Sequence, residues 1–257
     1  MRNIITIINK ELRIYFISPM AYIVTAMFLL IMGFLFFNIV SFFSAQSLQF
    51  RGFRQTLPYV NIHEAIFMPT FHNISIVLLL IIPLITMRLF AEEKKLMTTE
   101  LLFTSPLSVT EIIIGKYLSA LIVFILMLVL TLPMPVFMEI YSSVEWRLLI
   151  SSYTGIFFLG AIFLSVGLFG SSLTENQIIA AVISFGILLI LWLLGFASAF
   201  TSSYPLLNDI LSYLSIKEHL NNFLKGLLDT SDMFYFLSVI VFWLFSCHRV
   251  IDSHKWR

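Results

Sequence analysis

Apolar residues fall into six long stretches along the chain, and charged residues flank these stretches rather than interrupt them. A helix needs roughly 20 apolar residues to cross about 30 Å of hydrocarbon, and the stretches have about that length. The last stretch reaches it only if Asp232 or Arg249 extends to the membrane interface. The pattern predicts an all-α integral membrane protein with one transmembrane domain over residues 1–257. The expected spans cover residues 20–41, 65–88, 116–138, 148–172, 177–200 and 232–250.

Between Ser18 and the start of the chain, residues 3–17 have the pattern of an amphipathic helix. Ile4, Ile8 and Leu12 recur at helical spacing, while Lys10 and other polar residues lie on the opposite side. This pattern is typical of a helix in the membrane plane that turns its cations toward anionic headgroups. A simple membrane anchor with no other role has the same pattern.

The loop over residues 89–115, between the second and third spans, is too polar for lipid and too apolar for a solvated linker. Its charged start precedes the apolar run Leu101-Leu102-Phe103, which must pack against a partner surface or back on the protein's own helices. Ser108 or Thr110, together with Glu111, is expected to begin the next helix. The loop therefore predicts a short docking helix, with internal packing as the alternative.

Residues 208–229, between the fifth and sixth spans, are also amphipathic. Leucines and Phe223 mark an apolar side, and residues such as Glu218, Asn221 and Asn222 mark a polar side. The pattern predicts one or two short helices at the outer face, which either lie in the interface or act as a gate.

Composition supports a membrane protein and excludes other classes. Hydrophobic residues make up 60 % of the 257 residues and charged residues 11 %, whereas a soluble domain carries about 25 % charged residues. So few charges cannot solvate the surface of a soluble, disordered or nucleic-acid-binding protein. We therefore expect membrane lipid around the chain and no nucleic acid bound to it.

Basic residues are distributed unequally between the two faces of the predicted bundle. The terminal segments and the loop between the second and third spans carry ten of the 15 lysines and arginines, and the opposite face carries five. Basic residues favour the cytoplasmic side of a membrane. The sequence therefore predicts both termini in the cytoplasm and the spans in the cell inner membrane.

Motifs for catalysis, nucleotide binding or metal binding are missing from the sequence. The residue after Gly115-Lys116 is neither serine nor threonine, so no P-loop is present. His63 begins a zinc-protease pattern, but Phe67 replaces its second histidine, and we interpret His63 and His72 as interfacial or hydrogen-bonded. The span interiors also lack the ionisable residues that ion-driven transporters place there. The sequence predicts no catalytic, metal or cofactor-binding residue.

Three segments resemble the ABC-2 family of transporter permeases, the membrane subunits of ATP-binding-cassette exporters. Residues 9–22 resemble the family's interfacial helix and first span. Residues 83–94 with 99–108, followed by Gly115-Lys116, are similar to its coupling segment. Residues 213–232 resemble the subgroup that includes gliding-motility-associated and nitrous-oxide-reductase-maturation permeases.

The resemblance implies a permease subunit that a separate cytoplasmic ATPase energises by docking on the loop 89–115. It implies that ATP with Mg²⁺ binds to the ATPase and that a second permease copy, identical or different, completes the transporter. An intramembrane enzyme or maturation factor and an ion-coupled transporter remain the alternatives, and the cargo stays undetermined. The residues that the resemblance assigns to ATPase coupling are Glu92, Glu93, Thr99, Glu100, Leu101, Leu102 and Pro106.

Overall fold

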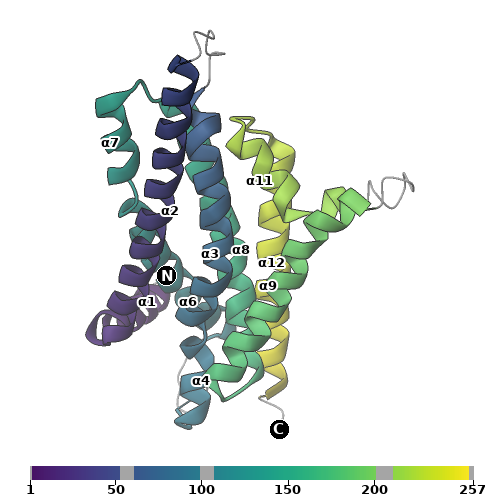
Figure 1. Cartoon of the computed structure of the whole chain (residues 1–257). Coiled ribbons are helices and arrows are strands. Elements are labelled where there is room, and N and C mark those ends of the chain that lie inside the picture. The colour runs from purple at the N-terminus through teal and green to yellow at the C-terminus, as the bar shows by residue number, and fades with distance from the viewer. Residues whose placement is uncertain (1, 53–60, 99–106, 201–210, 255–257) are drawn as a thin grey trace.

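The computed structural model describes residues 2–52, 61–98, 107–200 and 211–254, and every regular element in these ranges is helical. Figure 1 shows long helices side by side with shorter helices at both ends of the bundle. The helices are α1 (Arg2–Ile17), α2 (Pro19–Gly52), η1 (His63–Phe67), α3 (Met68–Thr86), α4 (Arg88–Lys95), α6 (Val109–Val129), α7 (Pro133–Tyr141), α8 (Trp146–Leu173), α9 (Gln177–Phe200), α11 (Ile216–Leu224) and α12 (Thr230–His254).

The predicted number of spans is confirmed, because the part of the chain that the structure describes contains six helical segments long and apolar enough to cross a membrane. The helices α1 and α4 and the C-terminal end of α12 lie at one end of the bundle, which we call the termini side (Figure 1). We call the opposite end, which holds α7 and α11, the far side. The six segments are Pro19–Ser47, His63–Lys95, Val109–Tyr141, Trp146–Leu173, Gln177–Gly195 and Thr230–Ser253.

The centre of the bundle is α8, which contacts α3, α6, α9, α11 and α12. Small residues along α8 let these neighbours approach closely, as expected for helix packing in a membrane. At Gly167, an added Cβ would lie 2.1 Å from Thr86 Oγ1 and 2.8 Å from Thr86 Cβ on α3. The spacing between α3 and α8 therefore depends on the absence of a side chain at this position.

Two of the spans are divided into separate helices. In the third span, α6 ends at Val129 and α7 begins at Pro133, which occupies a first-turn position where its missing N–H costs no hydrogen bond. In the second span, Pro83 lies inside α3, and a break at Met87 separates α3 from α4. The N–H of Met87 donates to the carbonyl of Pro83, which closes the last turn before the break.

The start of α6 confirms the predicted capping pattern. Ser108 is the N-cap, and its side chain accepts a hydrogen bond from the N–H of Glu111, whose carboxylate accepts one from the N–H of Ser108. This capping box satisfies two backbone donors that the first helical turn leaves without partners. The helix α6 therefore begins at Val109 and runs through Lys116 into the third span, as the capping pattern predicts.

On the far side, the expected amphipathic segment contains α11, which packs against α8 and α9. Ser215 caps its N-terminus by accepting a hydrogen bond from the N–H of Glu218. The helix ends at Leu224, and Gly226 just after it has a positive φ of 79°, which glycine adopts readily. The expected segment covers residues 208–229, and its first three residues, 208–210, lie outside the described residues.

Candidate functional site

A buried ion cluster joins three helices on the termini side. Lys116 of α6 is 1 % exposed, and its Nζ lies 2.8 Å from Glu11 Oε1 of α1 and 2.9 Å from Glu93 Oε2 of α4. The same Nζ donates to the carbonyl of Leu89 at 2.7 Å. Lys10 Nζ donates to Glu93 Oε1 at 2.9 Å and lies 3.7 Å from Glu11 Oε1. We call Lys10, Glu11, Glu93 and Lys116 the ion cluster.

The ion cluster contains two cations and two anions, so its formal charges cancel. The Lys116 ammonium donates hydrogen bonds to Glu11 Oε1 and to the carbonyl of Leu89, and Glu93 Oε2 lies within ion-pair distance without hydrogen-bond geometry. The ring of Phe90 adds a face 5.2 Å from Nζ. A buried charge is tolerated when it is paired and hydrogen-bonded, but removing one partner leaves the other uncompensated. The ion cluster therefore fixes α4 against both α1 and α6.

Two groups of α1 have pKa values that follow from this setting. Burial alone lowers the pKa of Lys10, but the hydrogen bond and charge of Glu93, with the charge of Glu11, outweigh it and raise the pKa overall. Burial raises the pKa of Tyr15 well above its usual range, and the nearby carboxylate of Glu11 adds to this shift. Lys10 is therefore held as a cation, and neutral Tyr15 donates its hydroxyl proton to the carbonyl of Ile85 at 2.9 Å.

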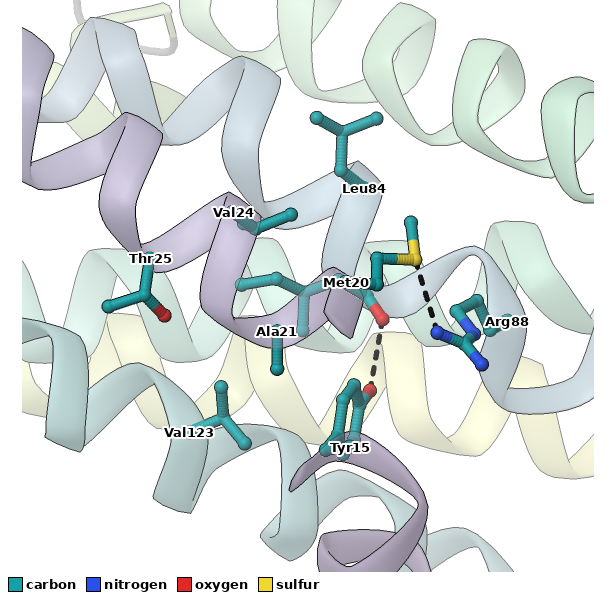
Figure 2. Close-up of a pocket in the computed structure, with 9 residues that line it drawn as sticks. Tyr15, Met20, Ala21, Val24, Thr25, Leu84, Arg88 and Val123 are labelled. Carbon is teal, nitrogen blue, oxygen red and sulfur yellow. Dashed lines mark hydrogen bonds between the residues drawn. The ribbon is translucent and has the colours of Figure 1, made fainter. Parts of the chain in front are cut away.

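Arg88, the first residue of α4, fixes the opposite flank of that helix. Its Nε donates to Glu92 Oε2 at 3.0 Å, and its Nη1 donates to Ser18 Oγ at 3.0 Å and to Met20 Sδ at 3.2 Å. Figure 2 shows Arg88 pointing toward Met20, with Tyr15 at the other side of a small cavity of about 10 Å³. The junction between α1 and α2 is thereby bonded directly to the start of α4.

Ser171 of α8 fills the break between α3 and α4. Its Oγ accepts hydrogen bonds from the N–H groups of Phe90 and Ala91 at 3.0 and 3.1 Å, and donates to the carbonyl of Met87 at 3.0 Å. These N–H groups belong to the first turn of α4, where no intrahelical acceptor exists. One side chain of α8 thus bonds the backbone groups that the break leaves without helical partners, and it ties α4 to the centre of the bundle.

Ser171→Ala is expected to destabilise the protein and lower its free energy of unfolding by about 1–3 kcal/mol, because two buried N–H donors lose their acceptor. Thermal unfolding of the purified protein in detergent measures the loss. Ser165→Ala is the matched control, since Ser165 is buried in the same helix and donates only to the carbonyl of Ile162 within that helix. Equal melting temperatures for the two variants would contradict the role given to Ser171.

The C-terminal end of α4 presents apolar side chains to the surroundings. Leu96 and Met97 are 62 % and 71 % exposed. Met97 has a positive φ of 56°, and the N–H groups of Met97 and Thr98 donate back to the carbonyls of Lys94 and Glu93. This is a Schellman ending, in which glycine usually occupies the position of Met97. A pocket of about 370 Å³ lies beside it, between α1 and α4.

The sequence-predicted coupling residues fall into two groups. Glu92 and Glu93 lie on α4, but Glu93 points inward to Lys116 and Lys10 rather than to the surroundings, and Glu92 pairs with Arg88. The remaining predicted residues lie outside the described residues, so their assignment stays a prediction. They are Thr99, Glu100, Leu101, Leu102 and Pro106.

Sequence reasoning missed Glu11, Lys116 and Ser171. Glu11 lies on the buried face of α1 with Ile7 and Tyr15, four residues from each, and this spacing is a signal that could have identified it. Lys10, on the polar face of this helix, bonds Glu93 of α4.

The histidines near the far side are buried or partly buried in the bundle. His63 Nε2 donates to the carbonyl of Leu224 at 2.7 Å, in line with the hydrogen-bonded role expected for it, and His72 is half-buried on α3. Among the residues that the structure describes, no three histidine, cysteine, aspartate or glutamate side chains are grouped closely enough to hold a metal ion.

Comparison with known proteins gives one family match. The sequence profile described as ABC-2 family transporter protein matches residues 5–247. The matched range begins in α1, includes all four members of the ion cluster and reaches into α12. A search of curated proteins found none that matches the chain.

Proposed function

We propose that this chain, which belongs to the ABC-2 family of transporter proteins, is a permease subunit of an exporter that a separate ATPase drives. Family membership and six apolar helices make it a multi-pass membrane component of a transporter. The sequence carries no P-loop, so energy from ATP has to enter through another subunit. The observation that carries the proposal is the way in which α4 is bonded to the rest of the bundle.

A force applied to α4 would spread through contacts on three sides. The ion cluster joins α4 to α1 and α6, and Arg88 joins it to the segment between α1 and α2. Ser171 joins the start of α4 to α8, which lies at the centre of the spans. Coupling between distant sites needs such contiguous packed or hydrogen-bonded connections. The arrangement suits a helix that receives movement at its exposed end and passes it into the membrane.

The exposed end of α4 favours docking over internal packing of the loop that follows. Leu96 and Met97 are uncovered at this end, and exposed apolar side chains in a group commonly mark an interaction site. Residues 99–106 follow directly, and they include Leu101 and Leu102. We assign the loop 89–115 to the ATPase interface, with ATP and Mg²⁺ bound by the ATPase itself.

The termini side faces the cytoplasm in this proposal, and the spans cross the cell inner membrane. The excess of lysine and arginine on that side supports the orientation. A second permease copy completes the transporter, and membrane lipid surrounds it. Spans that are rich in phenylalanine and carry their charged residues toward their ends suit an apolar or amphipathic cargo.

The double variant Leu101→Asp/Leu102→Asp is expected to release a co-expressed P-loop ATPase while the permease still folds. Two added charges cannot be buried in an interface without partners, so the amount of co-purified ATPase should fall at least tenfold. Pull-down through a tag on the permease, followed by ATPase activity in the eluate, measures the loss.

The matched control is Leu227→Asp/Leu228→Asp, which alters two exposed leucines on the far side and should leave the ATPase bound. Normal size-exclusion profiles for both double variants show that the permease folds. Full retention of the ATPase by the Leu101→Asp/Leu102→Asp variant would refute the docking assignment. Transport by the chain alone, without any ATPase, would refute the proposed function as a whole.

A further inference from the structure

We propose that a proton-dependent latch between His219 and Asp232 closes α11 onto the far side of the bundle. The latch consists of His219 on α11, Asp232 on α12, the amide of Asn222 and the backbone carbonyl of Tyr213. It makes the position of α11 depend on pH on that side of the membrane. The inference concerns a part of the chain remote from α4, and it stands whether or not an ATPase drives the protein.

The geometry of the latch is closely defined. His219 Nδ1 lies 2.5 Å from Asp232 Oδ1, and His219 Nε2 lies 2.9 Å from the carbonyl oxygen of Tyr213. Asn222 Nδ2 donates to the second carboxylate oxygen, Asp232 Oδ2, at 3.0 Å. His219 and Asp232 are both buried. The ring of His219 is therefore held at both nitrogens, and both oxygens of the Asp232 carboxylate are engaged.

The hydrogen bonds of the latch require one proton more than a neutral imidazole and a carboxylate carry between them. Both ring nitrogens of His219 face oxygen acceptors, but a neutral imidazole carries only one N–H. The additional proton lies on the ring or on the Asp232 carboxyl, and in either position it makes the hydrogen bond between Nδ1 and Oδ1. Removing it leaves one ring nitrogen as a lone pair that faces an oxygen, either Asp232 Oδ1 or the partly buried carbonyl of Tyr213, with no donor between them.

Aromatic rings around His219 favour a positive charge on it. The ring of Tyr235 stacks on the imidazole with centroids 3.9 Å apart and an interplanar angle of 20°. The rings of Tyr213 and Phe236 lie T-shaped to the imidazole, with centroids 5.8 and 6.3 Å away. A cation stacked on an aromatic face is stabilised by the ring quadrupole.

Few other titratable groups lie around the imidazole of His219. From α12 the imidazole meets Asp232 and Tyr235, and from the residues before α11 it meets Tyr213. Next to it on α11 itself are Lys217 and Glu218. The α8 side contributes uncharged rings, such as Phe158 stacked on Phe236.

The other end of α11 is fastened to the bundle by contacts that do not require this proton. Ser151 Oγ donates to the carbonyl of Phe223 at 2.8 Å, and His63 Nε2 donates to the carbonyl of Leu224 at 2.7 Å. These are two of the C-terminal carbonyls that a helix leaves without intrahelical partners. An added Cβ at Gly155 would lie 2.6 Å from Phe223 Cβ, so α11 also packs tightly on α8. Loss of the latch therefore frees the end of α11 near His219 first.

The direction of the pH effect follows from the proton count. The closed state binds one proton that the open state does not need, so closure weakens as pH rises. We expect α11 to be closed at the acidic end of a pH series and to open more often toward its alkaline end.

Cysteine accessibility tests the latch, because Cys247 is the only cysteine in the chain and is buried. In a Cys247→Ser background, Leu220→Cys places a reporter at a position of α11 that is 0 % exposed. Leu228→Cys, at an exposed position, serves as the reference for the intrinsic pH dependence of the thiol reaction. A membrane-impermeant maleimide is applied to the far side across the pH series.

The labelling rate of the Leu220→Cys protein, divided by that of the Leu228→Cys protein, should rise at least tenfold from the acidic to the alkaline end. Adding His219→Gln should make this ratio high and independent of pH, since glutamine does not titrate. Asp232→Ala should do the same, because alanine offers neither a donor nor an acceptor to His219. His72→Gln is the matched histidine control and should keep the parent profile.

A ratio that stays constant with pH in the parent would overturn the proposal, as would a His219→Gln profile that equals the parent's. Size-exclusion chromatography shows whether the reporter proteins fold. If Leu220→Cys fails this check, Ile216→Cys reports from another buried position of α11, at the end that includes His219. A pH response that His63→Gln abolishes and His219→Gln leaves intact would also refute the latch, because it would place the proton at the other end of α11.

Discussion

Replacing Lys116 by methionine is expected to destabilise the protein by about 3–5 kcal/mol, which is the usual effect of removing one partner from a buried ion pair. Methionine fills a similar volume but supplies no donor, so Glu11 and Glu93 lose the ammonium that lies 2.8 and 2.9 Å away. The carbonyl of Leu89 loses its donor as well. Thermal and denaturant unfolding in detergent measure the change.

Lys95→Met is the control for Lys116→Met, because Lys95 is an exposed cation at the end of α4. Its effect should stay within about 0.5 kcal/mol. Adding Glu11→Gln and Glu93→Gln to Lys116→Met should recover much of the stability, since the uncompensated carboxylates are then gone. If Lys116→Met is no less stable than Lys95→Met, the ion cluster does not hold the helices together.

Gly167→Ala is expected to destabilise the bundle by about 1–3 kcal/mol through overpacking. The added Cβ would lie 2.1 Å from Thr86 Oγ1 and 2.8 Å from Thr86 Cβ. Rotation of the Thr86 side chain cannot relieve the second contact, because the Cβ position is fixed by the backbone. The helices α3 and α8 would have to move apart, and this separation would disturb the hydrogen bonds of Ser171 just one turn further along α8.

Gly33→Ala provides the contrast for Gly167→Ala, because a Cβ at Gly33 has no neighbouring atom within 4 Å. Alanine is a better helix former than glycine, so Gly33→Ala should be neutral or stabilising by about 0.5–1 kcal/mol. Adding Thr86→Ala to Gly167→Ala should restore part of the stability. Equal unfolding temperatures for Gly33→Ala and Gly167→Ala would show that α3 and α8 have room to spare.

The features that could be predicted from the sequence follow from the requirements of a bilayer or from local patterns. A bilayer requires uninterrupted apolar length and internally satisfied backbone, so the six spans follow from hydropathy. The capping box at Ser108 and Glu111 is a local pattern of three residues' spacing and was also predictable. The helix break before Pro133 belongs to the same class, because proline acts on its own helix.

The ion cluster could not be predicted in this way. Glu11 and Lys116 are 105 positions apart in the chain, and nothing local to either residue identifies the other. The same holds for Ser171, whose polar neighbours are backbone groups about 80 positions away. A buried lysine within an apolar helix was the available signal, but it was interpreted as the boundary of a span.

Glu93 shows how the structure changes an experiment designed from the sequence. From the sequence alone, Glu93→Lys would be expected to release the ATPase and leave the membrane fold intact. In the structure, this substitution places a third cation beside Lys10 and Lys116. We now expect it to disrupt the packing of α4, so that loss of the ATPase in this variant would not identify an interface. Substitutions at Leu101 and Leu102 avoid this problem.

The pairing of Lys10 and Lys116 has a consequence for biogenesis. In the orientation that we propose, both lysines help to keep the termini side in the cytoplasm while the nascent polypeptide enters the bilayer. Acidic residues contribute little to this choice of orientation. Once the helices assemble, Glu11 and Glu93 neutralise these same lysines. The charge of Lys116 is thus used during insertion and then buried, while that of Lys10 is paired at the surface, so the finished surface is less positive than the signal that oriented it.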